Sequence, residues 1–232
     1  MSLQPEDRVS GTLYVVSTPI GNLEDMTFRA VRVLKEAAVI ACEDTRRTAL
    51  LLRRYEIRGR LFSYYQPREG QKIPVLLNML KEGKDVALVS DAGTPAISDP
   101  GFKLVREAVK AGIRVVPVPG PSALAAALSA GALPTNKFLF LGFPPPKSAA
   151  LRKALAALKE MDGTLIFYLP GRRLADFLEA VLETLGDRPI VIARELTKIH
   201  EEFLRGPASE LTVLAESRQL KGEMTILVGG AE

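Results

Sequence analysis

Short apolar runs alternate with helix-like patterns along the first half of the chain. Residues Thr12–Val16 predict a strand, and Thr27–Glu36 place apolar side chains at helical spacing. We also expect strands at 39–41, 61–65, 85–90 and 113–118, and helices at 45–55, 75–81 and 103–110. Strands that are apolar on both faces and separated by helices are typical of a mostly parallel sheet covered on both sides. The pattern therefore predicts an N-terminal α/β domain over residues 11–118.

A segment rich in proline and glycine interrupts this pattern. The run Pro117–Pro121 opposes any continuous helix or strand, so we place a hinge at about 117–121. Beyond it we expect helices at 122–130, 151–160 and 174–185 and strands at 137–141, 164–169, 190–193 and 224–228. Residues 202–204 and 211–214 favour one more antiparallel pair. The prediction is a second α/β domain over 121–230 with a mainly parallel or mixed sheet, and a ligand cleft between the two domains.

The composition is that of a folded protein. The 232 residues are 47% hydrophobic and 25% charged, which excludes a disordered chain. The apolar runs are far shorter than the ~20 residues that span a bilayer, and no secretion signal precedes Gly11. We therefore expect a cytoplasmic protein without membrane contact. One cysteine (Cys42) and one histidine (His200) exclude an internal disulfide and a zinc site built from His and Cys.

Positive charge is concentrated on one predicted helix. The formal net charge of +4 comes entirely from residues 1–120, and six arginines lie between Arg46 and Arg60. In this helix Arg46 and Arg53, and likewise Arg47 and Arg54, are separated by two turns. A solvated helix face explains the spacing, and a surface that binds a polyanion explains it equally well.

Two segments at predicted strand ends carry candidate chemistry. In Ser90–Pro95, Gly93 would let a ligand approach the backbone closely, although a plain connecting loop capped by Asp91 has the same sequence pattern. The carboxylates of Glu43–Arg47 suit a metal ion, a general base or the cap of the following helix. We assign Asp99 to capping the helix that begins next.

A third segment, Arg194–Glu202, is dense in ionisable groups. It fits a salt-bridged strand end, or a site where Lys198 or His200 accepts a proton. The phosphate-binding P-loop, the Gly-x-Gly-x-x-Gly fingerprint and the Gly-x-Ser-x-Gly elbow are all absent from the sequence.

Five segments resemble those of a known family, in the same order: Ser17–Leu23, Glu43–Arg46, Ser90–Gly101, Pro119–Ala123 and Arg194–Lys198. They look like the bacterial ribosomal small-subunit RNA methyltransferase I family, cytidine 2′-O-methyltransferases within the tetrapyrrole methylase superfamily. The resemblance runs from about residue 11 to residue 230. It implies two α/β domains with S-adenosylmethionine in the cleft between them, no metal, and a homodimer that acts on 16S ribosomal RNA of the small subunit.

The resemblance also assigns roles to residues. The implied cofactor-binding residues are Pro19, Asp91, Ala92, Gly93, Thr94, Ser122, Ala123, Tyr168, Leu169 and Met224. The implied substrate-binding residues are Arg46, Arg47 and Arg194. Glu43, Lys198 and His200 are the candidates for catalysis, because a ribose hydroxyl near neutral pH needs help to lose its proton.

Two other functions stay open. A tetrapyrrole (precorrin-type) C-methyltransferase would have a similar cofactor half, and Arg46 and Arg47 could bind the carboxylates of its substrate. The sequence around Tyr64 and Gly171 departs from the usual pattern of the family, which fits a non-catalytic module that binds S-adenosylmethionine and assembles on ribosomes.

Overall fold

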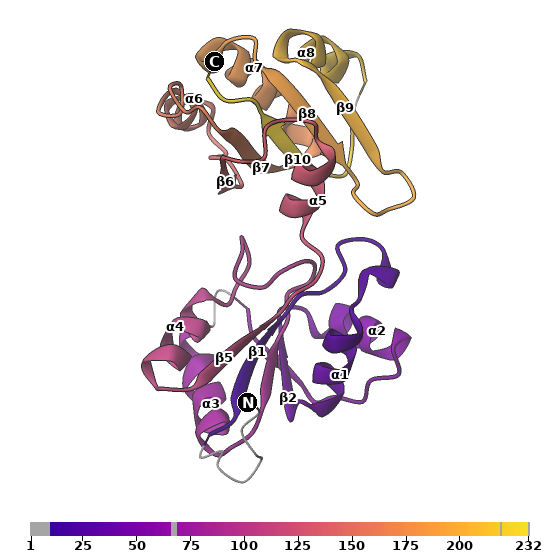
Figure 1. Cartoon of the computed structure of the whole chain (residues 1–232), viewed down its shortest axis with the longest axis vertical. Coiled ribbons are helices and arrows are strands. Elements are labelled where there is room, and N and C mark those ends of the chain that lie inside the picture. Colours follow the sequence, from indigo (N-terminus) through magenta and orange to yellow (C-terminus); the bar gives the residue numbers. More distant parts are fainter. Residues whose placement is uncertain (1–9, 66–68, 219, 232) are drawn as a thin grey trace. The chain divides into compact units, whose positions relative to one another are not determined.

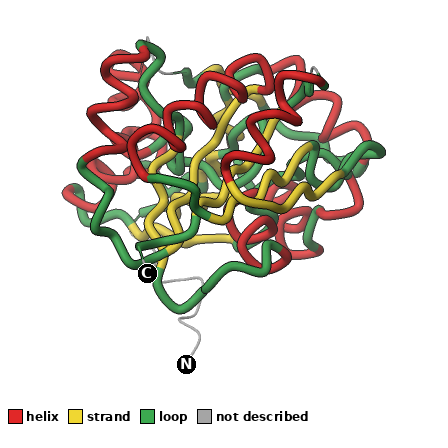
Figure 2. Tube along the Cα trace, turned by 90° about the horizontal axis from the view of Figure 1, so that it is seen from above, coloured by secondary structure: helices red, strands yellow, loops and turns green. Residues whose placement is uncertain are grey.

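The chain folds into two compact units. The computed structural model describes residues 10–65, 69–218 and 220–231. Its internal contacts divide the chain into an N-terminal unit that ends at Ser122 and a C-terminal unit that begins at Ala123. Within the described residues each unit contains one five-stranded sheet, with its helices labelled in Figure 1 and coloured red in Figure 2.

All strand pairs of the N-terminal sheet are parallel, in the order β3-β2-β4-β1-β5. The strands are β1 (Thr12–Val16), β2 (Val39–Cys42), β3 (Leu61–Ser63), β4 (Val86–Leu88) and β5 (Arg114–Val118). The helices are η2 (Leu23–Asp25), α1 (Phe28–Glu36), α2 (Thr45–Arg54), α3 (Glu69–Lys81) and α4 (Phe102–Lys110).

Both faces of this sheet are covered because successive side chains of a strand point to opposite faces. In β2, Ile40 and Cys42 pack with the apolar side chains of α1 and α2, whereas Val39 and Ala41 pack with those of α3 and α4. The continuous apolar runs in the sequence reflect this double burial, as predicted.

The C-terminal sheet is mixed, in the order β6-β7-β10-β8-β9. Strands β6 and β7 are parallel, and the other neighbouring pairs are antiparallel. The strands are β6 (Phe138–Gly142), β7 (Thr164–Pro170), β8 (Pro189–Arg194), β9 (Glu202–Pro207) and β10 (Glu223–Val228). The helices are α5 (Ala123–Ala130), α6 (Ser148–Ala156), η4 (Gly171–Arg173), α7 (Leu174–Leu185) and α8 (Ala208–Ser217). The predicted fold class, α/β with parallel and mixed sheets, is confirmed.

The two faces of the C-terminal sheet are covered differently. Alternate residues of β7 and β10, such as Phe167 and Ile226, pack in one core with α6, α7 and α8. On the opposite face α5 contacts β10, and the chain just after α5 passes close to Leu227 at Gly131.

The prediction of a strand at 211–214 is wrong, because these residues lie in α8. The β-branched pair Thr212 and Val213 favoured a strand, but Val213 is exposed and Ala208 and Leu211 are the buried residues of the helix. Their spacing of three residues places them on one helical face, where packing decides the conformation. Helix α3 also begins at Glu69 instead of the expected residue 75, with Pro74 inside the helix.

In the described part of the chain, every helix is too short or too polar to cross a lipid bilayer.

Candidate active site

Three loops of the N-terminal unit meet at one edge of its sheet. Strands β2, β4 and β1 are parallel neighbours, so their carboxyl ends lie side by side. Beyond this edge, the backbone N–H groups of Thr18 and Gly93 each donate to the carbonyl oxygen of the other residue, at 2.9 Å. The hydroxyl groups of Ser17 and Thr94 are also hydrogen-bonded, at 3.0 Å. The loops after β1 and β4 are therefore fixed to each other.

Gly93 makes this turn possible through its backbone conformation. Its φ of +79° lies in the left-handed region that a β-branched residue adopts only with strain. A Cβ atom at this position would have its closest contacts at 3.4 Å, with Ile20 Cγ2, and at 3.9 Å, with the carbonyl oxygen of Pro121. Gly93 itself is buried and its N–H and carbonyl groups are engaged by Thr18, but space remains where a side chain would stand.

Carboxylates from two loops gather beside this turn. Asp91 accepts a hydrogen bond from the backbone N–H of Asp44 at 3.1 Å, and its second oxygen lies 3.5 Å from the Arg47 guanidinium. Burial raises the pKa of the Glu43 carboxyl, and the negative charge of Asp91 raises it further, against the effect of Arg47. The structure therefore brings the predicted residues Glu43, Arg47 and Asp91 together.

Asp99 belongs to the same cluster, and the prediction that it caps the next helix is wrong. Gly101 is the N-cap of α4 and makes no side-chain capping bond. Burial raises the pKa of the Asp99 carboxyl to about 6, the charges of Glu43 and Asp91 add to the shift, and a hydrogen bond with Ser90 opposes it. We refer to Glu43, Asp91 and Asp99 as the carboxylate cluster.

The predicted arginines of α2 differ in their contacts. Asp44 caps this helix by accepting the Arg46 backbone N–H at 2.8 Å, which confirms the capping alternative for this residue. Hydrogen bonds with the Arg46 side chain and backbone lower the pKa of the Asp44 carboxyl to about 2. Arg53 and Arg54 are exposed at the carboxyl end of the helix.

In the C-terminal unit, three predicted residues form one row across the sheet. Met224 of β10 is paired with Leu169 of β7 on one side and with Arg194 of β8 on the other. The side chains of Leu169 and Met224 are buried in the core beneath α6, α7 and α8. They can therefore meet a ligand only through their backbone atoms.

Tyr168 points to the opposite face of the sheet, where α5 lies. Its hydroxyl oxygen accepts a hydrogen bond from the backbone N–H of Leu124 at 3.2 Å. Its ring makes edge contacts with Phe140 and Phe143 at centroid distances of 4.9 and 5.7 Å. Because α5 begins at Ala123, this hydrogen bond holds Tyr168 at the first turn of α5, where the predicted residue Ala123 lies.

Lys198 is held by two carboxylates close to this row. Its ammonium group lies 3.1 Å from Glu195 and 2.9 Å from Glu223. Burial lowers the pKa of Lys198, but the hydrogen bonds to the two glutamates outweigh it, and the net shift is upward. Lys198 is therefore a cation at neutral pH, and His200 is exposed in the same loop.

Arg194 is engaged by protein groups. Its Nε donates to the backbone carbonyl of Lys221 at 2.7 Å, and its guanidinium lies 3.3 Å from Glu202. Arg218 pairs with the same carboxylate. Arg194 thus fixes the loop before β10.

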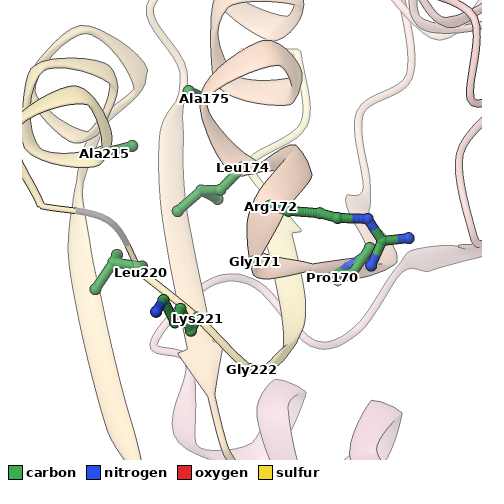
Figure 3. A pocket seen from close by; sticks show the side chains of 9 residues that line it. All are labelled: Pro170, Gly171, Arg172, Leu174, Ala175, Ala215, Leu220, Lys221 and Gly222. Atoms are coloured by element: carbon green, nitrogen blue, oxygen red, sulfur yellow. The ribbon is translucent and has the colours of Figure 1, made fainter.

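That loop also borders a pocket of about 480 Å³ between the start of α7 and the end of α8. Figure 3 shows Leu174 and Leu220 with Ala215 around it, and Lys221 beside Leu220. The predicted site residues do not line this pocket. Among the residues that the structure describes, no group of three or more His, Cys, Asp or Glu side chains could hold a metal ion.

The fold defined by these two sheets is that of known methyltransferases. Uroporphyrin-III-C-methyltransferase from Thermus thermophilus matches with a TM-score of 0.65 at 23% identity, covering 94% of both chains. The methyltransferase CobJ matches with a TM-score of 0.70 at 24% identity, covering 96% of this chain and 95% of that one.

The sequence places the chain within one family. The model of the tetrapyrrole (corrin/porphyrin) methylases matches residues 12–212. Two proteins named ribosomal RNA small subunit methyltransferase I are each 50% identical. The one from Halalkalibacterium halodurans covers 95% of this chain and 76% of its own, and the one from Escherichia coli O157:H7 covers 98% and 80%. A protein of the same name from Thermotoga maritima is 46% identical over 96% of this chain and its own full length. The chain belongs to the tetrapyrrole methylase family and is a methyltransferase, for which the family implies S-adenosylmethionine as methyl donor.

Replacing Gly93 by valine should abolish binding of S-adenosylmethionine while the protein stays folded. A branched side chain strains the turn and fills the space beside it that a ligand would enter. Isothermal titration calorimetry measures the affinity. Gly83→Val is the matched control, because Gly83 has a φ of +82° and open space around it, and it precedes the opposite end of β4. Equal affinity in the two folded variants would exclude this turn from the cofactor site.

Replacing Asp99 by asparagine should raise the free energy of unfolding by about 1–2 kcal/mol at pH 7–8, after solvent screening. Because the pKa of Asp99 rises on folding to about 6, the folded state disfavours the ionised form. This penalty is complete above pH 6 and absent below the unfolded pKa of about 4. Urea unfolding at several pH values should therefore show a stabilisation that fades between pH 6 and pH 4.

The control for this experiment is Asp44→Ala, which should have the opposite sign. The pKa of Asp44 falls on folding to about 2, so its ionised form stabilises the protein at neutral pH and the contribution is lost as the pH falls toward 2. An Asp99→Asn protein that is less stable than the wild type at pH 8 would show that Asp99 is not buried as a carboxylate.

Proposed function

We propose that this chain transfers a methyl group from S-adenosylmethionine to the 2′-hydroxyl of a cytidine in 16S ribosomal RNA of the small subunit. The observation that carries the proposal is the 46–50% identity, over nearly the whole chain, to proteins named ribosomal RNA small subunit methyltransferase I. A ribosomal RNA substrate supports a cytoplasmic location for the reaction. The family resemblance supports a homodimer, which light scattering of the purified protein tests.

The N-terminal unit fits a cationic, amino-acid-bearing cofactor. The carboxylate cluster supplies negative charge for a sulfonium and an ammonium group. The space beside Gly93, which has no side chain, permits close approach, and the Thr94 hydroxyl, hydrogen-bonded to Ser17, lies in the same turn. We propose cofactor contacts for Pro19, Asp91, Ala92, Gly93 and Thr94 in this unit.

In the C-terminal unit we propose cofactor contacts around the two ends of the Tyr168–Leu124 hydrogen bond. Ser122 and Ala123 directly precede Leu124 along the chain. Tyr168 offers an aromatic ring beside them, and Leu169 and Met224 offer backbone groups.

We propose that the carboxylate cluster accepts the ribose proton. S-adenosylmethionine supplies an activated methyl group, so the residues of this chain need only align the hydroxyl and take up its proton. Glu43 and Asp99 are partly buried; the charge of Asp91 raises the pKa of both carboxyls, and the charge of Glu43 adds to the shift of Asp99. A base of this kind works best when its pKa lies near the working pH. Lys198 is a cation paired with Glu195 and Glu223, so it suits a contact with the substrate better than proton uptake. His200 is exposed in the same loop.

The RNA backbone is proposed to meet α2. Arg53 and Arg54 are exposed, and Arg46 and Arg47 extend the positive surface toward the carboxylate cluster. Because Arg47 also pairs with Asp91, phosphate binding and the cluster would be coupled through one side chain.

The central test uses labelled S-adenosylmethionine and small subunits from cells that lack this protein. One ribose of 16S RNA should become labelled, and the label should appear in an alkali-resistant dinucleotide, because a methylated 2′-oxygen cannot attack the neighbouring phosphate. Label on a base, or turnover of a precorrin-type substrate instead of RNA, would contradict the proposal. Cofactor binding without transfer to any RNA would favour a non-catalytic module.

Changing Arg53 and Arg54 together to alanine should weaken RNA binding and flatten its salt dependence. Each phosphate contact contributes about −0.7 to −0.9 to the slope of log K against log salt, so two lost contacts reduce the slope by about one to two. Cofactor affinity should not change. Filter binding at several salt concentrations measures the slope. The control is Arg106→Ala with Lys110→Ala, which removes two cations from α4 on the other face of the sheet. An equal change of slope in both variants would contradict a specific role for α2.

A further inference from the structure

Glu69 is a buried carboxylate outside the five sequence segments quoted above for the family resemblance. Its side chain is only 4% exposed. One oxygen, Oε1, accepts hydrogen bonds from the Tyr64 hydroxyl at 2.9 Å and from the Gly101 backbone N–H at 3.1 Å. The other oxygen lies 3.2 Å from the Lys103 ammonium group. A buried charge is costly unless it is paired and hydrogen-bonded, and this one is both.

The contact with Gly101 fixes one end of the segment 93–101, whose backbone is strained and has long internal hydrogen bonds. Between Gly93 and Gly101 the chain has positive φ angles at two non-glycine residues, Ala96 (69°) and Ser98 (61°). Such residues are strained and persist only where the surroundings hold them. Two backbone hydrogen bonds within the segment are long: the Ala96 N–H donates to the Pro100 carbonyl oxygen at 3.3 Å, and the Ile97 N–H to that of Thr94 at 3.4 Å.

The segment is fixed at its two ends, and Ser90 holds Asp99 by a hydrogen bond in between. At one end Gly93 is fixed to Thr18 by two hydrogen bonds. At the other end Gly101 is fixed to Glu69. A Cβ atom at Gly101 would come within 2.9 Å of Leu88 Cδ2, so this end passes directly over the sheet. Asp99 lies two residues before the second tie, and the path of the segment sets its distance from the rest of the cluster.

We propose that Glu69 is a positioning residue for methyl transfer, which holds Asp99 beside Glu43 and Asp91 by fixing the Gly101 end of the segment. The proposal rests on the function proposed above, because it assigns Glu69 to the same carboxylate cluster. The ionisable groups that face Asp99 are Glu43 from the loop after β2 and Asp91 from its own loop, with Arg47 of α2 paired to Asp91.

The contacts of Glu69 define a set of variants. Glu69→Gln keeps the oxygen that accepts both hydrogen bonds and loses only the charge toward Lys103, whose side chain is half exposed and can turn to solvent. Glu69→Met removes the acceptor and keeps the volume. Glu69→Asp keeps the charge but shortens the side chain by one methylene, so that it no longer reaches Gly101. It takes the place of Glu69→Met if the Glu69→Met protein does not fold. Tyr64→Phe removes one hydrogen bond to the same oxygen and leaves the tie to Gly101 intact.

The first readout needs no activity: the titration midpoint of the Asp99 carboxyl, followed by carbon-detected NMR. In wild type, Glu69→Gln and Tyr64→Phe we expect a midpoint near 6. In Glu69→Met and Glu69→Asp we expect it to move toward the value of about 4 for a solvated carboxyl. The second readout is kcat and KM for RNA methylation, where the same two variants should lose about ten- to hundredfold in kcat with little change in KM for RNA.

A purely structural role predicts a different outcome. If Glu69→Met and Tyr64→Phe lower the melting temperature alike while the Asp99 midpoint and kcat stay at wild-type values in both, Glu69 does not position the cluster. A wild-type protein that methylates no RNA, with the midpoints as expected, would overturn the proposed function and leave the tie between Glu69 and Asp99 standing.

Discussion

The two backbone hydrogen bonds between Thr18 and Gly93 are the constraint on which the N-terminal site depends. They join the loops that follow two neighbouring parallel strands, and so extend the sheet by one bridge beyond its carboxyl edge. With this bridge in place, Asp91 reaches the N–H group of Asp44 across the top of β4, and Thr94 reaches Ser17. A glycine at the turn allows both the bridge and the free space beside it, since a side chain would strain the first and fill the second.

The bridge also concentrates negative charge in a small space. Glu43, Asp91 and Asp99 come from two loops, and their mutual repulsion adds to the effect of burial. Folding therefore stores an unfavourable interaction at this edge of the sheet, which a bound cation or a transferred proton relieves. Sites that bind and react commonly carry such local cost, because the rest of the fold is stable enough to maintain it.

Most of the fold could be predicted from the sequence because buried positions are apolar, and their spacing distinguishes strands from helices. Strands such as β2 are apolar on both faces, and their residues divide between two helical layers as the pattern indicates. Helix α8 was misjudged because Thr212 and Val213 carry strand propensity, whereas the packing of Ala208 and Leu211 decides the outcome. The turn at Gly93 and the cap at Asp44 were predictable because each depends on residues a few positions apart.

The roles of Asp99 and Glu69 could not be predicted in this way. Asp99 lies in a segment that the family resemblance marks, but its sequence neighbours suggested a helix cap, and only the folded path brings it to Glu43. For Glu69 the partner is the backbone N–H of Gly101, 32 residues away. Every residue except proline has such a group, so the sequence does not indicate which one Glu69 binds. The apolar run of β7 also did not indicate which of its residues face the main core and which face α5. Leu169 and Tyr168 are adjacent in the chain, yet one side chain enters the core and the other meets α5.

The C-terminal unit gathers its candidate residues by a different geometry. In a parallel sheet all the carboxyl ends of the strands lie at one edge. In the mixed sheet β10 is antiparallel to both of its neighbours, so its amino end lies beside their carboxyl ends. The edge that holds Leu169 and Arg194, at the ends of β7 and β8, therefore also holds Met224 at the start of β10. This brings the loop before β10 beside the loop after β8, where Glu223 and Glu195 bind Lys198 together. The charge on Lys198 is thus fixed by the antiparallel register itself. A shift of β10 by one residue would separate the two glutamates and turn Met224 out of the core.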